Sequence, residues 1–446
     1  MTSQEEARQK NYRTAVLVLL TLVYTFNFID RQIIGAVSPF IKDEMGLSDR
    51  QLGFLKGFAF AALYCTVGIP IAWLADRYNR VKIISISLAV WSAFTALTGL
   101  AQTTTTLMLA RVGVGIGEAG GSPPSHSIIS DLYPKEKRAS ALGFYSLGIP
   151  FGIMFAYFAA GQLVTTLGWR GTLIALGLPG ILLALLVYVF VKEPKRGAME
   201  APAKQAEQIS DILPAPTLKE TFSTLMKIPS WWAMCMGITF VSFGGYAVVN
   251  WGVDYITRWD PSMKEPKNFR WLLSWLGLIN GVAFGIGTYG GAVLADWFGK
   301  KSIRAYGWLP AIALIIGAPC LIYAFWVDDI KTYLILLAVY LTMNGVYLGP
   351  SFAIAQTLAP IRMRAMSTAL FFFILNMIAL GAGPWFVGEV SQLLTPQHGE
   401  THALRLSLTW LIVPYTLSIL AFFWASRTLP KDWAIAEARN QIASEG

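Results

Sequence analysis

The chain has 446 residues, of which 55% are hydrophobic and only 14% are charged. Because about a quarter of the residues of an ordinary soluble domain are charged, this composition argues against a soluble enzyme, a disordered chain and a nucleic-acid-binding protein. It predicts an all-α membrane protein that crosses the bilayer several times. The three cysteines, Cys65, Cys235 and Cys320, lie in apolar runs, so neither a disulfide framework nor a metal site is expected.

Twelve apolar runs predict twelve transmembrane helices, because a helix needs roughly 20 apolar residues to cross the bilayer core. The runs are 14–40, 51–75, 81–101, 104–130, 139–163, 169–191, 230–257, 269–295, 302–326, 331–358, 367–393 and 403–427. The first run continues through Asp30 and Arg31 to Phe40 without a small-residue cleavage site, so we expect a membrane span there and not a cleaved signal peptide.

The lysines and arginines are divided unequally between the two sides of these spans. With the N-terminus inside, 23 of the 35 fall on the inner side, 10 on the outer side and two within spans. Cytoplasmic loops carry the excess of positive charge, so we expect both termini in the cytoplasm. The net charge of +9 is then explained by the orientation of the protein in the membrane, and it does not indicate a nucleic-acid partner. The short tails suit a multi-pass protein of the cell membrane, most simply a bacterial inner membrane.

One polar, proline-rich segment at 194–229 predicts a cytoplasmic linker between two six-helix bundles. The predicted organisation is an N-terminal tail (1–13), a first bundle (14–193), the linker (194–229), a second bundle (230–428) and a C-terminal tail (429–446). The linker ends with alternating polar and apolar residues from Leu218 to Ile228. This pattern suits a helix on the membrane surface and equally a solvated linker helix.

The two halves repeat each other. The stretch Ala72–Arg80 (AWLADRYNR) after the second span matches Ala292–Lys300 (AVLADWFGK) after the eighth, 220 residues later. The stretch PKEKRA at Pro134 matches PIRMRA at Pro360, 226 residues later. Parallel repeats of this kind are typical of carriers in which two bundles rock about a central site.

The repeated loops carry charges that predict a gate on the cytoplasmic side. An aspartate at a helix end can accept charge-assisted hydrogen bonds from arginines and so hold one side closed. The alternative is a pair of solvated turns that only obey the orientation rule. Asn79 and Gly299 are expected in left-handed turn positions. The predicted gate residues are Asp76, Arg77, Arg80, Arg138, Asp296 and Arg364.

The loop Ala72-Trp-Leu-Ala-Asp-Arg-Tyr-Asn-Arg80 resembles the Gly-x-x-x-Asp-Arg-x-Gly-Arg signature of the major facilitator superfamily, with Ala72 and Asn79 in place of its two glycines. The resemblance covers about 15–428 of the chain. Three further stretches resemble more particularly the Spinster family. They are Asn27-Phe-Ile-Asp-Arg31, the segment from Arg111 through Glu118-Ala-Gly-Gly-Ser-Pro-Pro124, and Gly-Trp-Arg170.

This resemblance implies the major facilitator fold and a secondary transporter coupled to protons, with no cofactor besides this coupling ion. Animal members of the Spinster family carry lysophospholipids or sphingosine phosphate, so an amphipathic anion of this kind is the implied substrate. A proton-coupled transporter of a non-lipid organic anion, a sugar acid or a drug is the alternative.

Four ionisable residues lie deep in the predicted spans, namely Asp30, Arg31, Arg111 and Glu118. Such residues are costly in a bilayer and are functional candidates by default. We expect Asp30 and Glu118 to carry protons, and Arg31 and Arg111 to bind an anionic substrate through their planar forks. Glu118 is seven residues from Arg111, on the same helix face, which favours Glu118 as the proton carrier. A permanently paired quartet that pins two helices together is the alternative.

Further polar residues within the spans are predicted to contact substrate, with those of the second half on the opposite wall of a cavity. They are Asn27, Asn250, Asn280, Asn344, Tyr347 and Asn376. A helix–helix hydrogen bond is the simpler role for each of them. Asp254 and Glu389 lie near the outer span ends, where exposure to water is the simpler interpretation. The motifs Gly148–Gly152 and Gly381–Pro384 resemble the kinks of antiporters and equally suit plain helix packing.

Other functional classes fit the sequence less well. His398 and His402 have the i, i+4 spacing of a zinc pair but lack a third ligand and the His-Glu order of a metalloprotease. No phosphate-binding loop is present to drive an ATP-dependent pump. A channel would not need the two-half repeat with central charges, and a receptor would need a signalling domain. We therefore expect a monomeric transporter with a small-molecule substrate.

Overall fold

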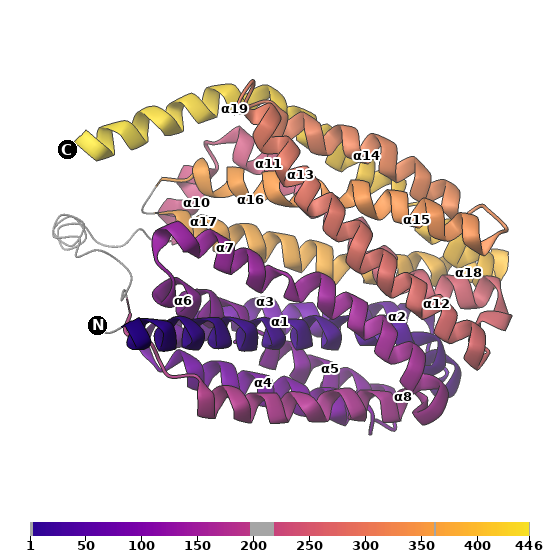
Figure 1. Cartoon of the computed structure of the whole chain (residues 1–446). Coiled ribbons are helices and arrows are strands. Elements are labelled where there is room, and N and C mark those ends of the chain that lie inside the picture. The colour runs from indigo at the N-terminus through magenta and orange to yellow at the C-terminus, as the bar shows by residue number, and fades with distance from the viewer. Residues whose placement is uncertain (1–2, 197–217, 361–362, 446) are drawn as a thin grey trace. The chain divides into compact units, whose positions relative to one another are not determined.

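The computed structural model (Figure 1) describes residues 3–196, 218–360 and 363–445. Every regular element in these ranges is helical. The chain divides into two compact units. Unit 1 comprises 1–204 together with 252–277, and unit 2 comprises 205–251 together with 278–446. The predicted linker falls largely on 197–217, which lie outside the described residues.

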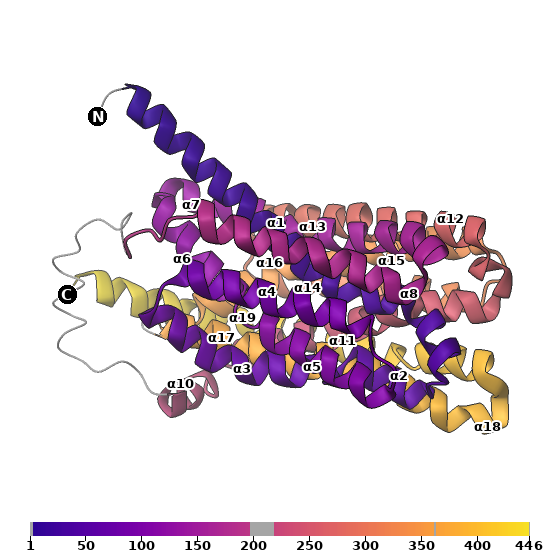
Figure 2. The ribbon, with the colours of Figure 1, turned by 90° about the horizontal axis from the view of Figure 1, so that it is seen from below.

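Unit 1 contains the first eight helices and the tip of a later helical hairpin. The helices are α1 (Ser3–Met45), α2 (Asp49–Lys56), α3 (Phe58–Arg77), α4 (Arg80–Thr98), α5 (Thr104–Glu118), α6 (Ser122–Leu132), α7 (Lys135–Ser146) and α8 (Gly148–Phe190). The hairpin tip, Gly252–Gly277, comprises the last turns of α11 (Pro229–Trp259), the short helix η1 (Pro261–Lys264) and nearly all of α12 (Pro266–Leu278). Figure 2 shows α4 and α8 running side by side, as their extensive contacts require.

Unit 2 contains the remaining helices. They are α10 (Leu218–Leu225), α11 as far as Trp251, η2 (Ile279–Ala283), α13 (Phe284–Gly299), α14 (Ala305–Ala324), α15 (Ile330–Gly345), α16 (Leu348–Thr357), α17 (Arg364–Leu375), η4 (Asn376–Ala382), α18 (Gly383–Thr409) and α19 (Ile412–Glu445). Two of these elements, η2 and η4, are π-helical.

Nine segments of the described residues are long and apolar enough to cross a membrane. They cover all or most of eleven of the twelve predicted runs, because the segments Ser140–Phe190 and Met366–Arg439 hold two runs each. The helices continue through kinks at Gly168 (φ +67°) and Gly399 (φ +73°), where the backbone is left-handed and favours glycine. The remaining run, 104–130, is divided between α5 and α6.

Side-chain caps determine where several helices begin. Ser48 and Gln51 form a capping box at α2, and Thr103 and Thr106 form one at α5. Asp329 caps α15, and its hydrogen bonds from the hydroxyl and backbone N–H of Thr332 lower the pKa of its carboxyl. This contribution to stability is present above the unfolded pKa of the aspartate and is lost as the pH falls through the folded value.

The prediction of left-handed turns at Asn79 and Gly299 is wrong. Asn79 has φ −66° and caps α4, since its side chain accepts a hydrogen bond from the Lys82 N–H at 2.9 Å. Gly299 ends α13 without a positive φ. An asparagine can reverse the chain or cap a helix, and here the adjacent helix start decided between the two.

Small residues let the helices of unit 1 approach closely. A Cβ on Gly117 of α5 would lie 2.6 Å from the backbone nitrogen of Trp91 in α4, and one on Gly115 would lie 2.5 Å from the carbonyl oxygen of Phe60 in α3. Gly148 and Gly152 of α8 likewise face α1, where an added Cβ would overlap Tyr24 or Phe28. Gly148 and Gly152 therefore pack closely against α1, and the antiporter interpretation of this motif stays a prediction.

Gly117→Ala is expected to destabilise the protein by about 1–3 kcal/mol, because the added methyl group meets backbone that must shift. Gly143→Ala is the matched control, since nothing lies within 4 Å of its added Cβ and alanine favours helix more than glycine does. Thermal unfolding of the two purified variants compares them. Equal melting temperatures would contradict the tight α4–α5 contact.

Candidate functional site

The four predicted intramembrane charges meet inside unit 1. Asp30 and Arg31 lie on α1, and Arg111 and Glu118 lie on α5. All four are buried, with at most 8% of each residue exposed. Asn27, one turn before Asp30 on α1, is buried beside Glu118. The structure thus brings together the first-half residues that the sequence predicted as a site.

Arg31, and not Arg111, pairs with Glu118. The Arg31 Nε donates to Glu118 Oε2 at 2.6 Å. The Arg31 guanidinium also lies 4.5 Å from the ring centre of Tyr64 and 5.2 Å from those of Phe28 and Phe60, in a cation–π arrangement. A helix face shared with Arg111 therefore does not determine which residue forms the ion pair with Glu118, because a neighbouring helix can supply it.

Arg111 donates a hydrogen bond to a backbone carbonyl group and to no carboxylate among the described residues. Its Nη1 donates to the carbonyl oxygen of Asp30 at 3.1 Å, and its guanidinium lies 5.4 Å from the Phe60 ring centre. Its Nε is buried without a hydrogen-bond acceptor among the described residues. Part of this fork therefore lacks a partner among the described residues.

Asp30 is a buried carboxylate without a hydrogen-bonded counterion. It is 0% exposed and forms no ion pair with a described residue. The Thr95 hydroxyl and the Trp91 indole N–H of α4 lie beside it and are the neutral donors within reach of its carboxylate. A negative charge on such a buried acid is energetically costly unless a cationic partner lies next to it. Asp30 therefore has more to gain from a proton than Glu118, which has Arg31.

Four of the five second-half polar residues, Asn250, Asn280, Asn344 and Tyr347, are buried in unit 2, and Asn376 is partly exposed. Tyr347 and Ser242 share a hydrogen bond of 2.9 Å between their hydroxyl oxygens, and Asn250 donates to the Tyr246 carbonyl within its own helix. Asn344 is 3% exposed, and its side-chain oxygen accepts no hydrogen bond from the described residues.

Asn280 and Asn376 lie in the two π-helices, η2 and η4. Such single-turn π-helices are frequent at functional sites because they expose backbone groups that an α-helix would pair. The substrate-contacting role of Asn280 and Asn376, like that of Asn250, Asn344 and Tyr347, stays a prediction.

Of the predicted gate residues, Arg80 has the most complete set of partners. Its side chain is 1% exposed and donates to Asp131 Oδ2 at 2.5 Å, Glu193 Oε1 at 2.6 Å and the Pro194 carbonyl at 2.9 Å. Arg138 donates to the Ser130 carbonyl at 2.9 Å. These contacts join α4, α6 and the chain that follows α8 at the end of unit 1 where α1 begins, called here the near end.

The other predicted gate residues lie apart from Arg80 or outside the description. Arg77 is exposed and stacks on Trp73, 4.0 Å from its ring centre. Asp296 is exposed and accepts a hydrogen bond from the Tyr306 hydroxyl at 2.9 Å. The side chains of Asp76 and Arg364 lie outside the described residues. Gating by this set stays a prediction.

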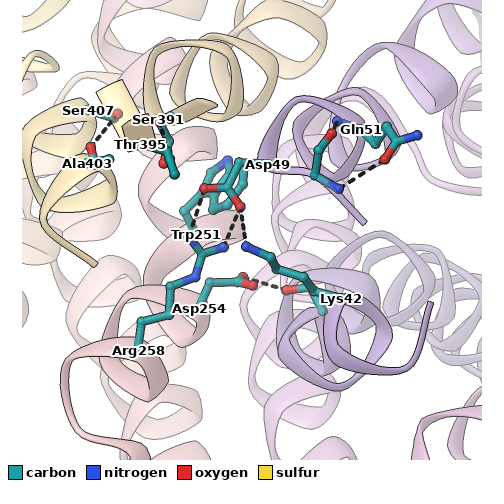
Figure 3. Close-up of polar contacts among 12 residues, drawn as sticks. Lys42, Asp49, Gln51, Trp251, Asp254, Arg258, Ser391, Thr395, Ala403 and Ser407 are labelled. Atoms are coloured by element: carbon teal, nitrogen blue, oxygen red, sulfur yellow. Dashed lines mark hydrogen bonds and ion pairs between the residues drawn. The ribbon is translucent and has the colours of Figure 1, made fainter. Parts of the chain in front are cut away.

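A second cluster of buried charges lies at the opposite end of unit 1, called here the far end. Figure 3 shows Lys42, Asp49, Asp254 and Arg258 converging from α1, α2 and α11. Asp49 accepts from Lys42 Nζ at 2.9 Å and from both terminal nitrogens of Arg258 at 2.7 and 2.8 Å. Asp254 Oδ2 accepts from Lys56 Nζ and from the Ser38 hydroxyl, each at 2.5 Å.

Sequence reasoning missed this cluster. The interpretation of Asp254 as facing water is wrong, because it is 1% exposed and ion-paired. Glu389 is only partly exposed. A signal was present, since Lys56 lies within the predicted span 51–75 and an ionisable residue there is a functional candidate. Lys56 was counted among the charges of the outer loops, and for that reason it was missed as a buried charge.

The histidine pair does not form a metal site with other described residues. The ring centres of His398 and His402 lie 5.5 Å apart in α18, next to Trp326. Among the residues that the structure describes, no group of three or more histidine, cysteine, aspartate or glutamate side chains is arranged to hold a metal ion.

Comparisons with known proteins agree with this geometry. A model of the Major Facilitator Superfamily matches residues 20–384. The chain is 29% identical to an MFS-type efflux pump of Mycolicibacterium smegmatis, over 95% of each chain. It is 27% identical to protein spinster homolog 1 of Xenopus tropicalis, over 92% of this chain and 79% of that protein. It also matches the crystal structure of a bacterial homolog to the human lysosomal transporter Spinster, in an inward-facing and unoccupied conformation, with a TM-score of 0.84 and 30% identity over 94% of this chain and 98% of the other.

Proposed function

The chain belongs to the Major Facilitator Superfamily, and from this premise we propose that it is a proton-coupled transporter of an amphipathic anion that works by alternating access. Family membership and the structural match already establish that the chain is a Spinster-like, multi-pass membrane transporter and not an enzyme. The proposal adds the coupling ion and the substrate class, with a lysophospholipid or a sphingosine-phosphate-like lipid as the substrate to test first.

The observation that carries the proposal is the incomplete pairing of the buried charges in α1 and α5. One ion pair is formed, between Arg31 and Glu118 Oε2, while Asp30 has no ion-pair partner and the Nε of Arg111 has no hydrogen-bond acceptor among the described residues. Buried polar groups are nearly always satisfied, and a quartet that only pinned two helices together would pair both acids. An unsatisfied acid beside an unsatisfied base is the arrangement expected of a site that exchanges a proton and an anion.

Competition for the arginines supplies the coupling. An anionic headgroup that binds Arg31 takes it from Glu118, and the acid left behind in a low-dielectric site then gains a proton. Arginine suits a phosphate or carboxylate headgroup because its planar fork stays charged and donates two parallel hydrogen bonds. Asp30 needs no such displacement, since no counterion is bonded to it, and we assign it the principal proton.

The same proposal places the near end of unit 1 in the cytoplasm and the far end outside. The basis is the excess of lysines and arginines on the side of both termini, 23 against 10. A bacterial inner membrane remains the proposed location.

Export of a drug or another non-lipid organic anion is the second candidate. The observation in its favour is the 29% identity to an efflux pump over nearly the whole chain. A sugar acid would use the same arginines but would have no apolar tail to place against the aromatic side chains around Arg31.

The two candidates can be separated by ligand screening and flux. Thermal shifts of the purified protein would be measured with lysophospholipids, sphingoid phosphates, sugar acids and drugs, and ligands that bind would then be tested in proteoliposomes with an imposed pH gradient. We expect amphipathic anions to stabilise the protein and to accumulate under the gradient. Stabilisation by sugar acids or drugs alone would favour the second candidate, and accumulation that ignores the pH gradient would contradict proton coupling.

Arg111→Lys is expected to weaken binding of the anionic substrate about tenfold, because the charge is kept but the planar fork is lost. Titration of the best ligand from the thermal-shift screen measures the effect. Lys264→Arg is the control, since Lys264 lies at the rim of the far end and should leave affinity unchanged. Equal affinity of the Arg111→Lys protein would point to a general electrostatic role for this residue.

A further inference from the structure

The two buried acids of the α1–α5 site differ in the kind of partner that lies beside them. Glu118 is bonded to the Arg31 guanidinium at 2.6 Å. The donors within reach of the Asp30 carboxylate are the Thr95 hydroxyl and the Trp91 indole N–H, which carry no charge. A cation next to an acid holds it ionised, whereas a neutral donor stabilises the ionised form to a smaller extent. The neutral donors of α4 therefore distinguish Asp30 from Glu118.

We propose that Thr95 and Trp91 are positioning residues that set the proton affinity of Asp30. Their hydrogen bonds stabilise the ionised carboxylate enough for the proton to leave, and they are weak enough for the proton to return. The inference rests on the proposed assignment of the principal proton to Asp30, and it adds to that function the two residues that make protonation reversible.

The first observation in favour of this role is the Thr95 hydroxyl. A threonine inside a helix commonly donates to the carbonyl oxygen four residues earlier. The other buried threonines of the described part of unit 1 all make this bond, namely Thr21, Thr25, Thr98, Thr172 and Thr257. Thr95 is 2% exposed and does not make it. Its hydroxyl is therefore the one that α4 directs at the neighbouring acid.

The second observation is the packing of Trp91, which lies one turn before Thr95 on the same face of α4. Trp91 is 0% exposed, and a buried indole N–H normally has a hydrogen-bond acceptor. The glycines that follow the arginine of α5 leave room for this side chain. A Cβ on Gly117 would lie 2.7 Å from the Trp91 Cβ, and one on Gly121 would lie 3.4 Å from Cζ3 of its indole. The indole is thus held in place, with Asp30 as the acceptor beside its N–H.

The charged groups around Asp30 do not take over this role. Glu118 and Arg111 of α5 act on Asp30 with opposite signs, and Arg111 donates to the backbone carbonyl of Asp30 and not to its carboxylate. The helix α4 has charged side chains only in its first turn. The one charged residue of α8 is Arg170, which is bonded to Glu44. The direct contacts of the Asp30 carboxylate are therefore those of Thr95 and Trp91.

Infrared difference spectroscopy of the full-length protein in nanodiscs measures the protonation of Asp30 without transport. The band of protonated carboxyl groups is titrated with pH, and the part that is absent from the Asp30→Asn protein belongs to Asp30. Thr95→Val and Trp91→Phe each remove one donor from the ionised form. Each is expected to move the midpoint of the titration to higher pH by about one unit, which is a tenfold tighter hold on the proton.

Three variants serve as controls. Thr95→Ser keeps the donor and should keep the wild-type midpoint. Thr98→Val removes a buried hydroxyl of the same helix that is bonded to the Phe94 carbonyl, and Trp231→Phe removes a buried indole bond to Ser367 in unit 2. Both should lower the melting temperature and leave the midpoint unchanged. If Thr95 and Trp91 only supported the fold, their variants would behave like these two.

The possible outcomes separate this inference from proton-coupled transport. An unchanged midpoint in Thr95→Val and Trp91→Phe, a shift to lower pH, or an equal shift in Thr98→Val would overturn the role of the donors, as would an Asp30 band that neither pH nor any variant changes. If one donor variant fails to fold, the other decides. Because the titration involves no transport, a carrier that proves to be uncoupled from protons would still show the shift, and an unshifted midpoint would leave pH-driven flux standing.

Discussion

Asp30→Asn is expected to reduce pH-gradient-driven accumulation of substrate in proteoliposomes to the level of empty vesicles. The asparagine mimics the protonated acid at a position where no described residue pairs with the carboxylate, so substrate still binds but no proton is carried. Counterflow exchange, which needs no net proton movement, should persist. The two assays on the same liposome preparation therefore separate loss of coupling from loss of folding.

Glu118→Gln serves as the companion variant and Glu44→Gln as the matched control. Glu118 is bonded to Arg31, so its neutralisation should also weaken substrate-dependent coupling, by freeing Arg31 permanently. Glu44 is half-exposed and paired with Arg170, and its replacement should leave accumulation intact. If both Asp30→Asn and Glu118→Gln proteins still concentrate substrate when driven by pH alone, the acids are structural and the carrier is a uniporter or uses another ion.

Arg80→Gln is expected to cause the largest loss of stability among single substitutions at the near end, about 3 kcal/mol. Removing one member of a buried ion-pair network leaves the other charges unpaired, which costs about 3–5 kcal/mol in fully buried cases. Here the carboxylates of Asp131 and Glu193 are 12% and 25% exposed, so water recovers part of the loss. Thermal or denaturant unfolding of the purified variant measures it.

Arg77→Gln is the control for Arg80, because it changes a charge of the same loop that is exposed and stacked on Trp73. It should alter stability by no more than about 0.5 kcal/mol. If the Arg77 and Arg80 variants unfold at the same temperature, the network around Arg80 contributes nothing beyond orientation. A large loss confined to Arg80 would make this residue the anchor of the predicted gate.

Hydropathy and charge distribution in the sequence were sufficient to predict the membrane class, and the resemblance of its loop motifs was sufficient to predict the family. Apolar runs of bilayer length identify helices whatever their neighbours are, and the loop at Ala72–Arg80 carries a resemblance that the family match confirms. The burial of Asp30, Arg31, Arg111 and Glu118 together was also predictable, because charges inside a span are rare and seldom face the lipid. The twelve spans, the gate and the linker boundaries stay predictions.

Only the tertiary structure decided which charges meet. Arg31 pairs with Glu118 across 87 residues and Lys56 with Asp254 across 198, and no local pattern encodes such partners. Helical periodicity tells which residues share a face, but the neighbour of that face depends on the crossing of helices, which in unit 1 is set by close contacts at residues such as Gly117. The sequence by itself therefore determined that this protein buries charges in a membrane, and the packing of its helices determined which of them are paired and which, like Asp30, have no ion-pair partner among the described residues.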